Sequence, residues 1–166
     1  DNLQAFFAAG GNVLIVIMVV TFVMWLLILE RVLFISLSGS TLRKRAEKNW
    51  SARDDKSSWY AFAIRDRSIS EVKQGTMSNL GVIKGIVAIL PLLGLLGTVT
   101  GMVEVFDVMA STGSSNARLM AGGITKATIP TMAGLVSSLS GIVMTNIIQG
   151  MADRQVRDTT HNLAIG

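Results

Sequence analysis

The sequence of 166 residues contains no cysteine and only one histidine, His161. Without cysteine, the chain can form neither disulfide bonds nor thiolate metal sites. With one histidine in each chain, neither a catalytic histidine pair nor a multi-histidine metal site can be assembled. We find no Ser-His-Asp set and no phosphate-binding loop, so we expect no enzyme activity, no cofactor and no metal ion.

Charged residues are also scarce, at 16% of the chain, whereas hydrophobic residues make up 50%. A soluble domain of this size is rarely so apolar, and here the apolar residues cluster in three long blocks. The sequence therefore predicts an all-α integral membrane protein with three transmembrane helices. The net charge of +4 does not indicate a nucleic-acid partner, because the positive charges follow a membrane topology.

The three blocks divide the chain into segments. We predict an outer N-terminal segment over 1–11, transmembrane helices over 12–35, 83–110 and 118–151, a cytoplasmic helical loop over 36–82, an outer loop over 111–117 and a cytoplasmic tail over 152–166. Apolar residues near helical spacing in the long loop predict helices that pack on each other or extend the membrane helices, with a break at Asp54–Ser58. Near the N-terminus, Leu3, Phe6 and Phe7 favour either an amphipathic turn at the membrane surface or a loosely ordered terminus.

The basic residues set the orientation of these segments. Eleven of the 15 Lys and Arg residues lie between Arg31 and Lys84, and two more lie in the tail, whereas 1–11 and 111–117 carry none. Because basic loops stay in the cytoplasm, the long loop and the C-terminus are predicted there, with the N-terminus outside. The basic cluster over 43–48 is read as a cytoplasmic anchor, with binding of anionic membrane lipid as the alternative.

The second block carries a stripe of small residues. Gly94, Gly97, Thr98 and Gly101 fall on one face of a helix. Small residues on a membrane helix allow another backbone to approach closely. The stripe therefore predicts a closely packed neighbouring helix, with the Thr98 hydroxyl directed into that contact or into a pore.

The third block is more polar than the first. Thr131, Gly134, Ser138, Gly141 and Thr145 share one helix face, which we expect to meet protein or water because polar atoms are costly in hydrocarbon. Pro130 lies inside this block and predicts a bend. The first block has no such stripe, so we expect it to face lipid.

Three ionisable residues flank the outer ends of the second and third blocks. Glu104 and Asp107, one helical turn apart, could gather cations at a pore mouth, or could be interfacial acids that pair with Arg118. Lys126 is a candidate functional cation by its position in the membrane, and could pair with Glu104 or Asp107 of a neighbouring chain. The alternative for Lys126 is a side chain that extends to the outer interface.

Residues Pro91–Met102 resemble the second-transmembrane-helix signature of the MotA/TolQ/ExbB proton-channel family, and its ExbB branch most of all. Lys126–Val136 resembles the third helix of the same family. The Glu30–Arg31 pair that closes the first block is also typical, and we expect it to be a solvated pair at the interface. Ser140 stands where the family often has proline, and Lys126 where it commonly has glutamate.

This resemblance implies a homo-oligomeric ring, a pentamer, in the inner membrane of a Gram-negative cell, with the N-terminus in the periplasm. It implies a dimer of an ExbD-like single-span partner inside the ring, whose transmembrane Asp carries protons. The ring would use the proton-motive force and a TonB-like protein to energise outer-membrane transport. Thr98 and Thr131 correspond to the family's two pore threonines, and Lys126 could pair with the partner's Asp.

Two other functions remain open on the sequence. A TolQ-like subunit would serve cell-envelope maintenance, and a non-conducting membrane scaffold would use every Gly, Ser and Thr for packing. The polar face of the third block separates a channel from a scaffold. If its side chains line water in an oligomer, a channel is favoured; if each is buried against a helix, a scaffold is favoured.

Overall fold

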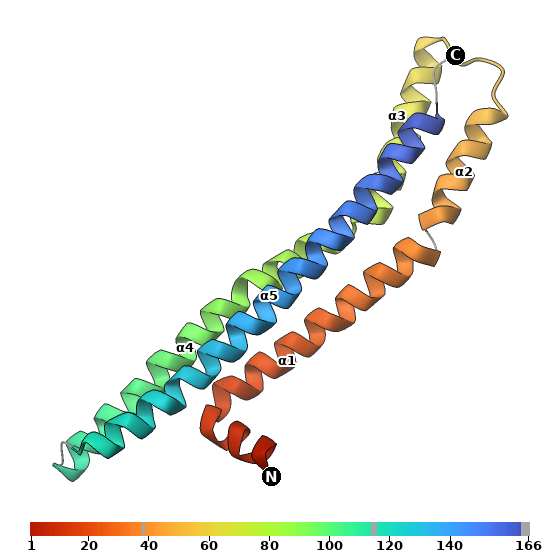
Figure 1. Ribbon diagram of the computed structural model, residues 1–166. Coiled ribbons are helices and arrows are strands. Elements are labelled where there is room, and N and C mark those ends of the chain that lie inside the picture. The colour runs from red at the N-terminus through yellow and green to blue at the C-terminus, as the bar shows by residue number, and fades with distance from the viewer. Residues whose placement is uncertain (38, 114–115, 164–166) are drawn as a thin grey trace. The chain divides into compact units, whose positions relative to one another are not determined.

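The computed structural model contains five helices (Figure 1). They are α1 (Asn2–Leu37), α2 (Gly39–Ser51), α3 (Trp59–Met77), α4 (Leu80–Thr112) and α5 (Ala117–Asn162). The structure describes residues 1–37, 39–113 and 116–163, without the side chains of 6–10, 39 and 40; Phe6 and Phe7 therefore lie outside the described side chains. Within this part of the chain there is no strand, and three helical stretches are long and apolar enough to cross a membrane. The predicted all-α fold with three candidate spans is confirmed.

The connection between α4 and α5 is shorter than the predicted loop over 111–117. Gly113 has a φ of 64°, a left-handed conformation that suits glycine and ends α4 after Thr112. Asn116 then precedes α5, and its side-chain oxygen accepts a hydrogen bond of 2.9 Å from the backbone N–H of Arg118. This satisfies one of the free N–H groups in the first turn of α5.

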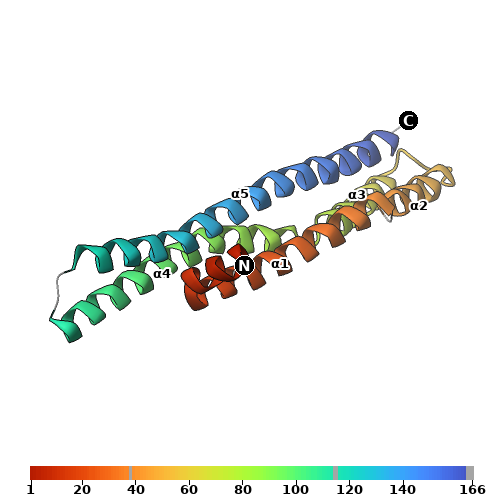
Figure 2. The same ribbon diagram turned by 60° about the horizontal axis from the view of Figure 1, so that its bottom comes forward.

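The chain divides into two compact units, of which the first holds Asp1–Trp25 and Lys84–Ile142. In it, α4 and α5 run side by side in both ribbon views (Figures 1 and 2). Gly11 has a φ of 66° and breaks the helical path of α1 near its start. Beyond this break, Leu14, Ile17 and Met24 form a buried stripe on α1, whereas Val16 is 47% exposed. The first block is therefore buried along one side, and contact of its exposed side with lipid stays a prediction.

The second unit holds Leu26–Ile83 and Val143–Gly166. Its α2 and α3 pack on each other and are separated by residues 52–58, so the expected pair of packed helices with a break between them is confirmed. Ser58 caps α3 by accepting from the backbone N–H of Ala61 at 3.2 Å. A small core of Trp50, Ala61 and Leu163 joins these helices to the end of α5.

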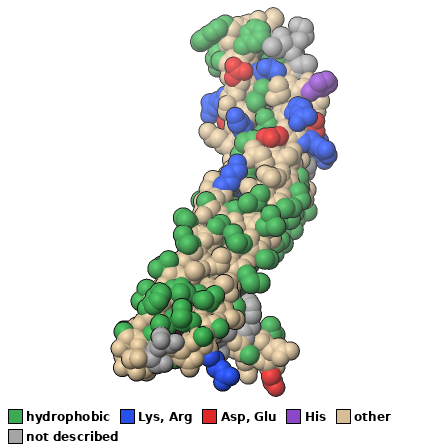
Figure 3. Space-filling view, turned by 60° about the vertical axis from the view of Figure 1, so that its left-hand side comes forward, with side chains coloured by type: hydrophobic (Ala, Val, Ile, Leu, Met, Phe, Trp, Pro, Cys, Tyr) green, Lys and Arg blue, Asp and Glu red, His purple; other side chains and the backbone are tan. Residues whose placement is uncertain are grey.

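The surface of the protein is apolar along the candidate membrane spans and charged near the end of α5. On the face drawn in Figure 3, hydrophobic side chains cover much of the spans, and Lys and Arg side chains gather near His161, close to the end of α5. Exposed apolar side chains on the spans include Leu92 at 63%, Val136 at 69% and Leu139 at 62%. Such a surface requires lipid or another protein chain as its surroundings.

Candidate functional site: the α4–α5 seam

The small-residue stripe of α4 packs directly against α5. A Cβ atom added at Gly101 would lie 2.8 Å from the Cβ of Ala127, and one added at Gly97 would overlap the ring of Pro130. Both contacts are closer than real Cβ atoms tolerate, so only glycine allows this separation of the two helices. The predicted close neighbour is thus confirmed, and it is α5 of the same chain.

α5 approaches α4 through a glycine of its own. A Cβ atom at Gly134 would lie 2.7 Å from the carbonyl oxygen of Leu90, and one at Gly94 would lie 3.1 Å from the Cα of Thr131. We call this contact the α4–α5 seam; it comprises Leu90, Gly94, Gly97 and Gly101 on α4 and Ala127, Pro130, Thr131 and Gly134 on α5. Pro130 is buried in the seam and α5 is helical on both sides of it, while the bend predicted there stays a prediction.

Thr98 and Thr131 meet in the middle of the seam. Their side-chain oxygens are in hydrogen-bond contact with each other, and both residues are half-buried. The Thr131 hydroxyl also lies 3.0 Å from the carbonyl oxygen of Gly94, and the Thr98 hydroxyl lies 3.3 Å from that of Ala127. Because a hydroxyl both donates and accepts, either threonine can be the donor within the pair while the other donates to a backbone carbonyl.

Ser138 extends the polar contacts of the seam by two helical turns. Its hydroxyl donates a hydrogen bond of 3.0 Å to the carbonyl oxygen of Val87, and Ser138 is 4% exposed. Pro91 has no N–H, so the carbonyl four residues earlier, that of Val87, lacks its helical donor. This bond was not predicted from the sequence, although the separation of four residues between Val87 and Pro91 identifies the free carbonyl.

Three other hydroxyls of α5 form a different group. Those of Thr125, Thr128 and Ser140 donate to carbonyls of their own helix, at 2.9, 2.9 and 2.7 Å. A hydroxyl bonded in this way can face an apolar environment without an unsatisfied donor. Thr131 and Ser138 of the predicted polar face reach α4, whereas these three hydroxyls, which lie outside that face, bond α5 alone.

An ion pair lies at the end of the seam near Gly101 and Ala127. The Lys126 ammonium lies 2.8 Å from the Glu104 carboxylate of the same chain, with 42% and 63% of the two side chains exposed. Lys126 therefore pairs with Glu104 of its own chain. Its pairing with an acid of a neighbouring chain stays a prediction. Asp107 is exposed, and within the described part of the chain it forms no ion pair with Arg118 or with another cation.

A cavity of about 270 Å³ adjoins this ion pair. It is lined by Asn12 and Val13 of α1, Gly97, Thr100 and Glu104 of α4, and Lys126 of α5, all in the first unit. The break of α1 at Gly11 leaves room for the cavity beside the seam. Polar side chains from three helices thus surround a space beside Gly97 and Gly101 of the seam.

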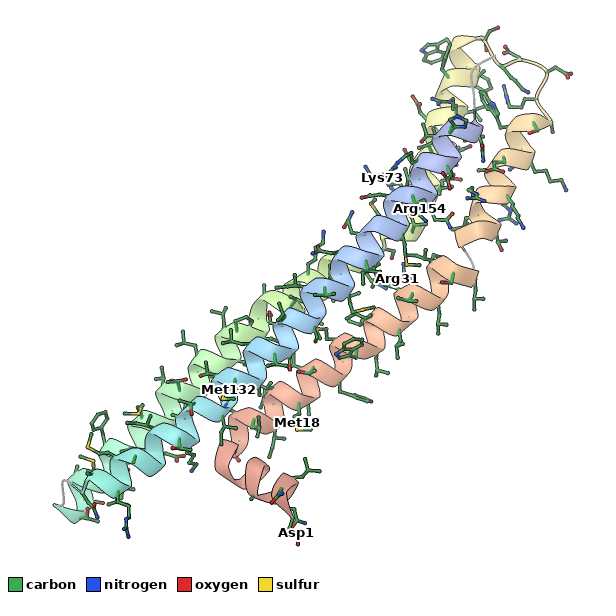
Figure 4. All side chains as sticks on the ribbon, viewed as in Figure 1. Asp1, Met18, Arg31, Lys73, Met132 and Arg154 are labelled. Atoms are coloured by element: carbon green, nitrogen blue, oxygen red, sulfur yellow. The ribbon has the colours of Figure 1, made fainter. Side chains whose placement is uncertain are left out.

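The Glu30–Arg31 pair differs from its prediction. Arg31, labelled in Figure 4, is only 4% exposed, so it is not a solvated residue. Its guanidinium binds both carboxylate oxygens of Glu30, at 2.7 and 2.6 Å, and donates to the carbonyl oxygen of Gly75 at 3.1 Å. The group also lies 4.5 Å from the ring centre of Phe34. Arg31 therefore ties α1 to the last turn of α3 within the second unit.

The fold and the seam define a class of protein: a polytopic membrane protein that holds a pair of hydroxyls between two apolar helices. The pattern of the MotA/TolQ/ExbB proton channel family matches residues 35–161. This stretch is most of the chain, and the protein belongs to that family.

Individual relatives point to the ExbB branch. Biopolymer transport protein exbB1 of Vibrio cholerae serotype O1 is 35% identical over 96 residues, which are 57% of this chain and 42% of that protein. Putative biopolymer transport protein ExbB-like 3 of Synechocystis sp. is 38% identical over 72 residues, covering 42% and 34%. Biopolymer transport protein ExbB of Salmonella typhimurium is 34% identical over 82 residues, covering 49% and 34%. The chain thus spans less than half the length of these relatives, and its resemblance to ExbB is confirmed.

Proposed function

We propose that this protein is an ExbB-like subunit of a proton channel and motor in the inner membrane of a Gram-negative cell. The observation that carries the proposal is the contact between the Thr98 and Thr131 hydroxyls in a glycine-lined seam. Hydroxyls that can exchange donor and acceptor roles are suited to pass a proton or to hydrogen-bond a carboxyl group that carries one. Membership of a proton channel family agrees with this role.

The working form is a ring of identical chains, a pentamer, around two copies of an ExbD-like single-span partner with a transmembrane Asp. The exposed apolar side chains on α4 and α5 support such an assembly, because they suit contact with other helices as well as with lipid. The ring uses the proton-motive force and a TonB-like protein to energise transport across the outer membrane. The N-terminus is periplasmic and the C-terminus cytoplasmic, and Glu104 and Asp107 lie at the outer pore mouth.

A non-conducting scaffold is the second candidate. It is favoured by the burial of Ser138 and by its bond to the Val87 carbonyl, since this residue packs against a helix of its own chain instead of lining water. Thr145 is likewise only 5% exposed. In a scaffold, the Thr98–Thr131 pair would serve packing alone.

Native mass spectrometry of the full-length protein, purified in mild detergent from cells that contain its partners, tests the assembly. We expect five copies of the chain with two copies of a single-span protein that has an Asp in its membrane helix. A species with only one copy of the chain would contradict the ring. Deletion of the gene then separates the two envelope roles. Loss of receptor-dependent uptake with normal detergent resistance supports the ExbB-like role, and the reverse phenotype supports a TolQ-like role.

A further inference from the structure

The cavity beside Lys126 is lined by oxygen atoms that could bind a cation, but the positive charge of Lys126 offsets the negative charge of Glu104. Glu104 contributes a carboxylate, and Asn12 and Thr100 contribute an amide and a hydroxyl to its lining. Oxygen atoms of these types are the ligands that hard metal cations prefer. With Glu104 alone, the cavity would combine one negative charge with neutral oxygens, which is suited to a monovalent cation such as Na⁺.

Lys126 cancels this charge. Its ammonium lies 2.8 Å from the Glu104 carboxylate, in the position that a bound cation would take, and contributes one positive charge to the same cavity. A fixed cation in a pore lining raises the electrostatic barrier to other cations. Protons differ from metal ions here because they move between water and hydroxyl groups without a vacant coordination site.

We propose that Lys126 determines the ion selectivity of this outer cavity by excluding metal cations from Glu104. The inference rests on the proposed channel function and adds to it the residue that keeps the entrance specific for protons. Glu104 lies six residues, or about 9 Å along α4, from Thr98. In the proposed topology it is on the outer side of the Thr98–Thr131 pair. A metal cation held at Glu104 would therefore, in that topology, stand outside the Thr98–Thr131 pair, on the side from which protons enter.

Binding of radioactive ²²Na⁺ to the purified full-length protein, measured by equilibrium dialysis, tests this role. Replacing the lysine in Lys126→Gln leaves Glu104 uncompensated, and we expect at least about tenfold tighter Na⁺ binding than in the wild type. Lys126→Met should show the same gain. Lys126→Arg keeps the positive charge and should bind Na⁺ as weakly as the wild type.

The double variant Glu104→Gln/Lys126→Gln identifies the ligand. Because it removes both charges, we expect the gain in Na⁺ binding to disappear. Unchanged Na⁺ binding in both Lys126→Gln and Lys126→Met, with wild-type helicity and oligomer size, would overturn the inference, and so would a gain that survives in the double variant. The assay uses no proton gradient. The two proposals can therefore fail separately. If the protein conducts no protons but its Lys126 variants gain Na⁺ binding, the channel function is refuted, whereas the exclusion of metal cations from Glu104 by Lys126 is supported.

Discussion

The Ser138 hydroxyl donates to the Val87 carbonyl at 3.0 Å, and this carbonyl is the one that Pro91 leaves without a helical donor. A side chain of α5 therefore completes the backbone hydrogen bonding of α4. In an apolar environment an unsatisfied carbonyl is costly, so this bond makes a proline acceptable inside a membrane helix. It also fixes the register of the two helices two turns from the Thr98–Thr131 pair.

Ser138→Ala should lower the free energy of unfolding by about 1 kcal/mol, because it removes the donor to a buried carbonyl. The effect should shrink in a Pro91→Ala background, where the N–H of residue 91 can bond Val87 again. Reversible unfolding in detergent measures both. Ser140→Ala is the matched control, since Ser140 bonds only its own helix. An equal loss for Ser138→Ala with and without Pro91 would contradict this explanation.

Gly97→Ala should separate α4 from α5, because the new Cβ overlaps the Pro130 ring. We expect a loss of about 2 kcal/mol in the free energy of unfolding and a lower yield of assembled protein. Gly85→Ala on the same helix is the control; its Cβ meets no atom within 4 Å, so stability should hold or rise slightly. Gly97→Leu should lower the yield of assembled protein more than Val16→Leu does, because Val16 is an exposed position of α1. Equal assembly of the two leucine variants would argue against the seam.

Arg31→Lys should loosen the junction between α3 and α4. A lysine ammonium cannot bind both Glu30 oxygens and the Gly75 carbonyl in the geometry of a guanidinium. Hydrogen exchange over Thr76–Leu80 should become faster, with a loss of about 1–2 kcal/mol in local stability. Arg67→Lys is the control, because Arg67 pairs with Glu71 on an exposed surface. Equal exchange rates in both variants would show that Arg31 does not hold this junction.

The loop between α2 and α3 should be sensitive to acid. Hydrogen bonds from the Ser58 hydroxyl, and then from the backbone N–H groups of Ser58 and Ser57, hold the pKa of Asp55 below its ordinary value. A carboxyl group with a lowered folded-state pKa stabilises the fold above its unfolded-state pKa, and this stabilisation is lost as the pH falls through the folded-state pKa. Proteolysis of the loop should therefore increase below about pH 4.

Asp55→Asn should remove this dependence, because the amide does not titrate, while its oxygen can still accept from the backbone N–H groups of Ser57 and Ser58. Asp54→Asn, one residue earlier, is the matched control and should keep the acid sensitivity of the wild type. Identical pH profiles for the two asparagine variants would rule out Asp55 as the titrating group.

Much of the fold follows from the sequence, because long uncharged blocks and periodic small residues depend on local spacing alone. The stripe of Gly94, Gly97 and Gly101 predicts a close helix, and the charges predict where the spans end. Spacing does not say which chain supplies the neighbouring helix. The structure supplies α5 of the same chain, and with it the contact between Thr98 and Thr131.

The ionic contacts are harder to predict. Lys126 and Glu104 are 22 residues apart, and their contact depends on how α4 and α5 are aligned by the glycines between them. The sequence suggests that Arg31 is a surface residue, yet it is buried. Its guanidinium contacts the ring of Phe34 and the carbonyl of Gly75, which is 44 residues away in the chain. Such partners arise from tertiary packing, which residue type and period do not encode.

Proton flux tests the central claim, that the Thr98–Thr131 pair serves ion movement. The full-length protein is reconstituted with the proposed single-span partner in liposomes, and proton uptake is measured with a pH-sensitive dye under an imposed gradient. Valine nearly matches threonine in shape but has no hydroxyl. We predict that Thr98→Val/Thr131→Val still binds the partner and loses most of the flux, whereas Thr98→Ser/Thr131→Ser retains more. Wild-type flux in the valine variant, with the partner still bound, would show that these threonines are packing residues and would contradict the account.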